Sequence, residues 1–111
     1  MDTYKIKANR CIVGEPTNVG VASKCRGCFD FILTVYGCNA HITDSTVINP
    51  VELCAKLSLL LKSEQKEETS ISVCFFDSEK TFNVIPRKCR LGFEIRTYDC
   101  LAIEEIIRKL Q

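Results

Sequence analysis

The stretch CFDFILTVY, residues 28–36, determines the fold that we expect for this chain. Its large apolar side chains occupy every second position, at Phe29, Phe31, Leu33 and Val35. Successive side chains of a strand point to opposite faces, so this period of two predicts a strand with one buried face. The many aromatic and β-branched residues of the stretch favour the same structure.

Alternation predicts further strands on either side of this one. Residues 71–75 alternate apolar and small polar side chains, and residues 89–96 alternate apolar with charged or small ones. Both patterns are typical of half-buried strands. We also expect a short strand over residues 19–25, a turn at Arg26–Gly27 and another turn over residues 77–80.

Two segments have helical features. Asn49 precedes Pro50 and Glu52 in an arrangement typical of a helix start, with Asn as the cap and Pro in the first turn. The helix is predicted to end near Lys62. A second helix is expected after Asp99, another capping residue, because the apolar residues that follow have helical spacing. These are Ala102, Ile103, Ile106, Ile107 and Leu110.

The predicted order is strand, strand, helix, strand, strand, helix. This order indicates an α+β fold, a two-layer sandwich in which two helices cover one face of an antiparallel sheet, as in ferredoxin-like domains. Such a sandwich has one more strand after the last helix. We expect the sequence, which ends at Gln111, to lack that strand.

The composition narrows the classes of function. The 111 residues carry 15 basic and 14 acidic side chains and fit one domain. Because no basic patch stands out, we do not expect a nucleic-acid partner. The chain has no apolar run long enough for a membrane span and no signal-peptide pattern, so we expect no membrane partner and a cytoplasmic location.

The eight cysteines admit a disulfide framework, a metal site, or reduced thiols that pack as small hydrophobes. We favour reduced, buried thiols. Cys25-x-x-Cys28 followed by Cys38-x-x-His41 resembles a zinc site, but a strand would hold Cys28 and Cys38 roughly 30 Å apart. Two sulfurs on one zinc ion must lie within roughly 4 Å. A redox pair formed by Cys25 and Cys28 remains an alternative.

Three ordered motifs resemble a known enzyme family. They are CIVGEPT at 11–17, VYGCNAH at 35–41 followed by NPVE at 49–52, and TFNVIPRKC at 81–89 running on to EIR at 94–96. Together they resemble the lid and dimerisation domain of the zinc metallopeptidase superfamily that includes aminoacylase, acetylornithine deacetylase, succinyl-diaminopimelate desuccinylase and carboxypeptidase G. The resemblance covers about residues 10–98.

This resemblance implies a division of the chain. Residues 1–18 would be a linker from the catalytic domain that carries the GEPT motif, and residues 19–111 the lid. The partners would be a second copy, bound through the sheet edge and a helix, and the catalytic zinc domain of the parent enzyme. Since the chain has a single histidine, we do not expect it to be active alone.

The resemblance also assigns roles to four residues, each of which has a simpler alternative. Glu15 would be a zinc ligand in the parent enzyme, or a solvated residue in a turn. His41 would reach the active site of the other subunit and polarise the scissile carbonyl, or be a loop histidine without a role. Asn83 and Arg96 would bind substrate; alternatively Asn83 stabilises its own turn, and Arg96 lies on the polar face of its strand.

The parent enzyme is therefore expected to deacylate N-acyl amino acids in the manner of acetylornithine deacetylase or succinyl-diaminopimelate desuccinylase. The lid of a dipeptidase or carboxypeptidase is an alternative. So are a stand-alone dimerising interaction module and a thiol-based redox or metal protein.

Overall fold

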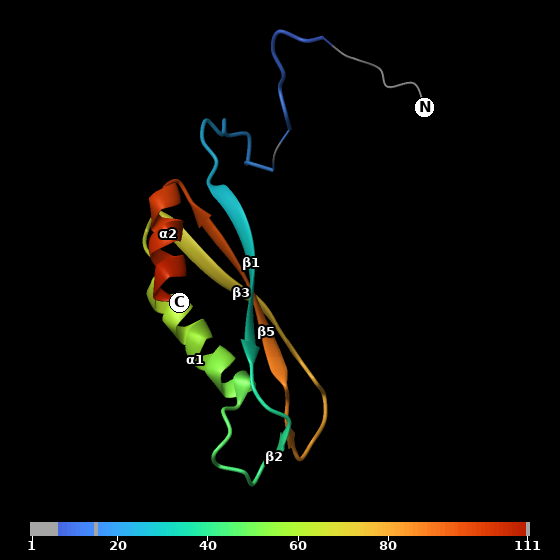
Figure 1. Cartoon of the computed structure of the whole chain (residues 1–111). Helices are drawn as coiled ribbons and strands as arrows, with labels where there is room; N and C mark the ends of the chain where they lie inside the picture. The colour runs from blue at the N-terminus through green and yellow to red at the C-terminus, as the bar shows by residue number, and fades with distance from the viewer. Residues whose placement is uncertain (1–6, 15, 111) are drawn as a thin grey trace, which may run out of the picture.

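A computed structural model describes residues 7–14 and 16–110. Their helices and strands are, in order, β1 (Gly27–Tyr36), β2 (Ala40–His41), α1 (Pro50–Ser63), β3 (Thr69–Ser78), β4 (Val84–Ile85), β5 (Lys88–Thr97) and α2 (Cys100–Lys109). Strands β1, β5 and β3 form an antiparallel sheet in the order β1-β5-β3, and β2 pairs with β4 in a small second sheet. Both helices lie on the same side of the larger sheet (Figure 1). The α+β sandwich with two helices on one face is confirmed.

The core lies between the central strand β5 and the two helices. The large apolar residues of β5 are buried at alternate positions, as the sequence predicts, and the helices and β3 contribute the rest. They are Cys89, Leu91, Phe93 and Ile95 from β5, Cys54 and Leu61 from α1, Ile71 from β3, and Ile103 and Ile106 from α2. Because β5 has a neighbour on both sides, its inner face is more fully covered than that of β1 or β3.

Both helix starts form as predicted. The Asn49 side chain accepts a hydrogen bond from the Val51 amide at 3.0 Å, and its amide group donates to Glu52 at 3.0 Å. Asp99 accepts from the Leu101 amide at 2.9 Å. These caps satisfy amides that have no partner within the helix.

An irregularity in β3 changes the predicted alternation. The register shifts between Val73, which pairs with Phe93, and Phe75, which pairs with Gly92. Cys74 is the extra residue of this bulge, so Phe75 lies on the open face of the sheet rather than on the helix-covered face with Val73. Its ring covers Gly92, where a Cβ atom would meet the Phe75 ring at 2.2 Å.

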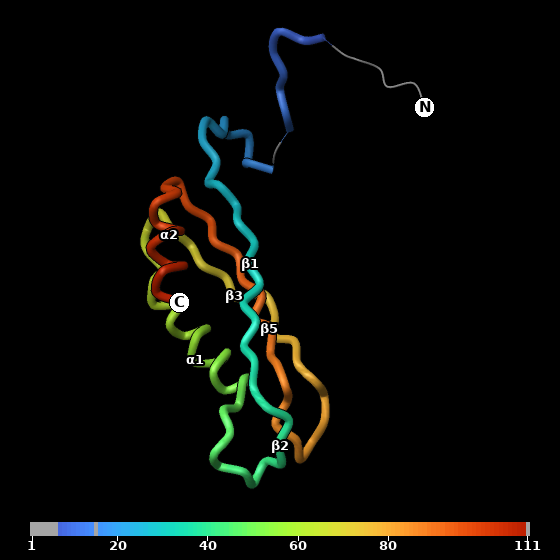
Figure 2. Tube along the Cα trace, in the orientation of Figure 1, coloured from blue at the N-terminus to red at the C-terminus, as the bar shows by residue number. Residues whose placement is uncertain are grey.

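The predicted strand over residues 19–25 is wrong. These residues form no strand, and Asn18 and Val19 have φ angles of 47° and 68°. A turn joins the Gly20 amide to the Thr17 carbonyl at 2.9 Å. Figure 2 shows this N-terminal segment leading away from the sheet, and a strand cannot form without a neighbour to pair with.

Two predicted turns are also wrong. Gly27 already belongs to β1, and β3 continues to Ser78 before the chain turns. The Arg26 guanidinium lies 5.5 Å from the centre of the Tyr98 ring and donates to the Glu67 carbonyl at 3.1 Å. These contacts join the residue before β1 to the segment before β3 and to the residue after β5.

The cysteines require one correction. All eight are free thiols, but only Cys54 and Cys89 are buried, and the other six are exposed. The general expectation of burial is therefore wrong. The predicted strand is confirmed as β1, so Cys28 and Cys38 lie near opposite ends of it.

No helix in the described part of the chain is long and apolar enough to cross a membrane.

Candidate functional site

The loops at one end of the sheet form a tip that carries two of the predicted site residues. Beyond β1, the chain forms β2, and beyond β3 it forms β4, with His41 opposite Val84. Gly37 permits this arrangement, because a Cβ atom there would lie 2.9 Å from the Ile48 carbonyl oxygen and from Pro50. The Gly37 amide also donates to the Arg87 carbonyl at 2.7 Å. We name residues 37–49 and 79–87 the tip.

His41 is exposed, and its ring is oriented by Thr43. The Thr43 amide donates to Nδ1 at 3.4 Å, and the Thr43 hydroxyl lies 2.8 Å from the same nitrogen. Because a ring nitrogen that accepts from an amide carries no proton, the Thr43 amide favours the neutral tautomer that holds its proton on Nε2. His41 can therefore donate a hydrogen bond from Nε2 to a carbonyl oxygen outside the chain.

Asn83 lies beside His41 through the backbone. Its carbonyl accepts from the Ile42 amide at 3.2 Å, immediately after the β2–β4 pairing. The φ angle of Asn83 is 67°, a left-handed conformation that asparagine tolerates better than most residues. The side chain is exposed. The tip thus carries an exposed imidazole and an exposed carboxamide on two segments that are joined by backbone hydrogen bonds.

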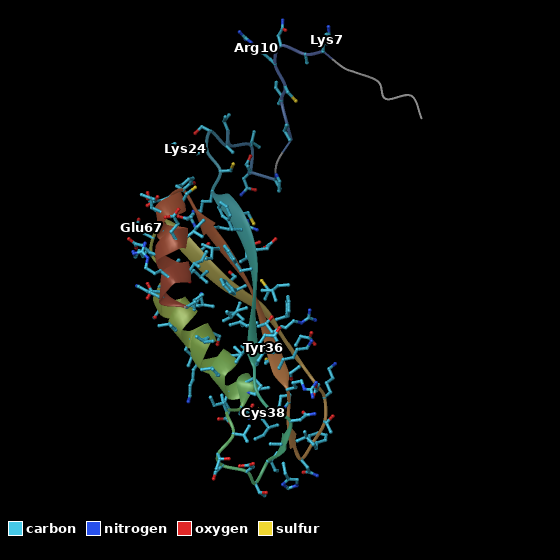
Figure 3. All side chains as sticks on the ribbon, in the orientation of Figure 1. Lys7, Arg10, Lys24, Tyr36, Cys38 and Glu67 are labelled. Atoms are coloured by element: carbon cyan, nitrogen blue, oxygen red, sulfur yellow. The ribbon has the colours of Figure 1, made fainter. Side chains whose placement is uncertain are left out.

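Arg96 lies at the other end of the molecule. It stands opposite Cys28, at the start of β1, and opposite Ser70, near the start of β3. Arg96 lies eight residues after Lys88 along β5, which corresponds to roughly 27 Å. Asn83 precedes Lys88 in the sequence and lies in the tip. Figure 3 shows Tyr36 and Cys38 toward the tip, and Lys24 and Glu67 at the opposite end. The structure therefore does not bring Arg96 to Asn83 or His41 within one chain.

Arg96 takes part in a small charged network on the open face of the sheet. Its Nε lies 2.6 Å from Glu94, and Glu94 accepts from the Cys28 thiol at 3.2 Å. The hydrogen bond to Arg96 and, next, the one from Cys28 lower the pKa of Glu94. The same carboxylate raises the pKa of Arg96 and the pKa of the Cys28 thiol.

The resemblance implies a zinc centre in the catalytic domain of a parent enzyme, outside the described residues. Among them, one group of possible ligands lies close together, Cys28, Asp30 and Glu94, with ligand atoms within 4.8 Å of one another. It includes neither His41 nor Glu15, and Glu94 is already paired with Arg96. Glu15 itself lies outside the described residues. The role of Glu15 as a zinc ligand in the parent enzyme therefore remains a prediction.

Sequence reasoning missed Thr43 and the Ile42 amide, which orient His41 and Asn83. A hydroxyl residue two positions after a histidine was the only local signal for the first. The second depends on pairing between segments about forty residues apart, which no local pattern indicates.

The chain was also compared with families of known proteins. A family model described as the peptidase dimerisation domain matches residues 24–111. The chain belongs to this family. The resemblance found in the sequence motifs is thereby confirmed at the level of the family.

Individual proteins resemble this dimerisation domain in sequence or fold. A succinyl-diaminopimelate desuccinylase from Buchnera aphidicola subsp. Cinara cedri is 33% identical over 88% of the chain. An uncharacterized metallohydrolase from Methanocaldococcus jannaschii is 28% identical over 91% of it. The crystal structure of an amidase of the hydantoinase/carbamoylase family from Burkholderia multivorans covers 76% of the chain with a TM-score of 0.63 and 18% identity, which shows a shared fold.

The dimerisation domain is much shorter than these proteins. It spans 30% of the length of each of the two sequence relatives and 22% of the amidase chain.

Proposed function

We propose that this domain is the lid of a zinc-dependent amidohydrolase that removes the acyl group from N-acyl amino acids, and that it self-associates. The observation that carries the proposal is the exposed tip, where the pairing of β2 with β4 joins the segment that carries His41 to the segment that carries Asn83. The family match and the 33% identity to a desuccinylase support the reaction class. We further propose a cytoplasmic location, in keeping with six exposed free thiols.

The tip is suited to bind a polarised carbonyl. In amide hydrolysis negative charge develops on the carbonyl oxygen, and a fixed donor near that oxygen stabilises the transition state. Nε2 of His41 is such a donor, because Thr43 occupies Nδ1. The neighbouring Asn83 side chain offers both a donor and an acceptor to the same substrate.

Arg96 suits a different part of the substrate. A guanidinium can bind a carboxylate through two parallel hydrogen bonds, as an N-acyl amino acid would require. Since Arg96 lies far from the tip of its own chain, one small substrate cannot touch both. We propose that the tip of one lid and Arg96 of the other serve the same active site across the dimer.

The catalytic zinc would lie in another domain of the parent enzyme, where it would supply an activated water. We propose that Glu15 is a ligand only in that setting.

A chimera tests the proposal. Residues 24–111 would replace the dimerisation domain of the Buchnera desuccinylase, and hydrolysis of N-succinyl and N-acetyl amino acids and of dipeptides would be measured. His41→Ala should lower kcat by about 10²–10³-fold, the usual loss for an oxyanion donor. Thr81→Ala, which changes another exposed residue of the tip, is the matched control and should have little effect. An active chimera indifferent to His41→Ala would refute the role of the tip.

The substrate panel separates the alternatives. Preference for N-acyl amino acids supports the deacylase reading, and preference for dipeptides would indicate the lid of a peptidase.

Mixing two inactive chimeras tests the arrangement across the dimer. In a mixed dimer of His41→Ala and Arg96→Ala subunits, one site would receive both intact residues. Random exchange should therefore restore about one quarter of the unmodified activity. No recovery after proven exchange would show that both residues act from the same subunit.

A further inference from the structure

Glu94 lies on the central strand of the sheet and holds one edge of the Arg96 guanidinium. Its Oε1 accepts from Arg96 Nε at 2.6 Å, and its Oε2 accepts from Nη2 at 3.4 Å. Both carboxylate oxygens thus bind the same edge. A guanidinium is planar and its five N–H groups have fixed directions, so two bonds along one edge define the orientation of the whole group.

The second edge of the guanidinium is directed away from Glu94. Nη1 and Nη2 carry a further pair of parallel N–H groups there, and this pair matches a carboxylate in a bidentate arrangement. The Arg96 side chain is 57% exposed, whereas that of Glu94 is 23% exposed. Glu94 is therefore the inner member of the pair, and Arg96 is the member that a substrate can reach.

Glu94 is itself held by its neighbours. It stands opposite Asp30 of β1 and opposite Ser72 of β3, and it accepts from the Cys28 thiol at 3.2 Å. Side chains on the strands of a sheet are placed more precisely than side chains on loops. Glu94 thus provides a fixed support for Arg96.

Charge compensation is the simpler explanation of this contact. Ligand atoms of Asp30 and Glu94 lie within 4.8 Å of each other, and like charges directly opposite one another destabilise a sheet. On this explanation Arg96 only neutralises the two carboxylates. Neutralisation requires a nearby positive charge but no particular orientation, whereas the two bonds to Glu94 fix the plane of the guanidinium.

We propose that Glu94 is a positioning residue, which orients Arg96 so that its Nη1–Nη2 edge binds the carboxylate of the substrate. The inference rests on the proposed role of Arg96 and adds the residue that prepares it. Without Glu94, each substrate that binds would have to order the long Arg96 side chain, and this ordering lowers affinity. A carboxylate outside the scissile bond keeps its charge throughout the reaction, so the loss affects the ground state and the transition state alike.

Nuclear magnetic resonance of the whole chain tests the orientation. The Arg96 Nε–H group should give a ¹H–¹⁵N signal that exchanges slowly with water, identified by its absence in Arg96→Lys. Glu94→Ala should make this exchange fast. Asp30→Asn is the matched control and should keep the exchange slow, because it removes a neighbouring carboxylate while leaving both Glu94 bonds in place. Equally fast exchange in the wild-type chain and in Glu94→Ala would overturn the positioning role.

Kinetics of the desuccinylase chimera test the effect on the substrate. For each variant, kcat and KM are measured with an N-acyl amino acid and with its amide, which lacks the carboxylate. Glu94→Ala should raise KM for the acid by about 2–10-fold, the usual cost of ordering one long side chain, with kcat nearly unchanged. KM for the amide should not change. Asp30→Asn should behave as the unmodified chimera with both substrates.

The direction of the change in KM separates the explanations. If Glu94 only competed with the substrate for Arg96, its removal would lower KM for the acid. If charge compensation were its whole role, Asp30→Asn and Glu94→Ala would change KM alike. Either result would overturn the positioning role.

Arg96→Ala separates the positioning role from the proposed function. It should raise KM for the acid by about 10–100-fold, the usual loss for a hydrogen-bonded charged group. A raised KM in Arg96→Ala with an unchanged KM in Glu94→Ala would overturn the positioning role and leave the role of Arg96 standing. An unchanged KM in Arg96→Ala would remove both.

Discussion

The Ile42 amide donates to the Asn83 carbonyl at 3.2 Å and so joins the loop after β1 to the loop after β3. This bond extends the β2–β4 pairing, in which His41 stands opposite Val84. It joins the segment that carries the His41 imidazole to the segment that carries the Asn83 carboxamide, and the two are distant in sequence. The geometry of the candidate site depends on this junction.

The tautomer of His41 can be measured directly, because the chain has only one histidine. In the neutral ring, two-bond ¹H–¹⁵N correlations should show the proton on Nε2 and none on Nδ1. The Thr43 amide at 3.4 Å from Nδ1 is the reason. Thr43→Ala, which retains the amide, should preserve the pattern. A proton on Nδ1 in the wild-type chain would contradict the proposed donor role.

The left-handed backbone of Asn83 should affect stability independently of substrate binding. A β-branched residue at φ 67° is strained, so Asn83→Val should lower the free energy of unfolding by about 1–2 kcal/mol. Asn83→Gly should be close to neutral, since glycine adopts this conformation freely. Urea unfolding measures both. Equal stability of the Val and Gly variants would show that this conformation imposes no strain.

Gly92 should be intolerant of a methyl group, because the Phe75 ring lies where the Cβ atom would be. Gly92→Ala is expected to cost about 1–3 kcal/mol, the usual range for overpacking. Combining it with Phe75→Ala should make the Gly92 change much less costly, in a double-mutant cycle followed by urea unfolding. Strictly additive effects would mean that the ring does not cover Gly92.

Cys28 should alkylate slowly for a surface thiol, because Glu94 raises its pKa and the thiolate is the reactive form. Replacing the carboxylate in Glu94→Gln lowers the pKa of Cys28, so the thiolate fraction and the rate with iodoacetamide at about pH 8.5 should both rise. Peptide mass spectrometry can follow Cys28 separately from the other thiols. Asp30→Asn is a matched control with a smaller expected change, since Asp30 contributes least among the causes of the shift. An unchanged rate in Glu94→Gln would show that the Cys28–Glu94 hydrogen bond does not persist in solution.

The amino-acid sequence by itself determined the elements whose signals are local. Alternation of apolar residues predicted β1 and β5, and Asn49 and Asp99 predicted both helix starts, because side-chain period and capping depend only on neighbours along the chain. The ordered motifs alone were sufficient to indicate the family. Only the tertiary structure decided which residues meet. It moved Phe75 to the open face through the bulge and left residues 19–25 without a strand. It also joined the segments that carry His41 and Asn83, while it holds Arg96 far from both. Each of these outcomes depends on the register between strands distant in sequence, and that register is set by the packing of the whole sheet rather than by any local pattern.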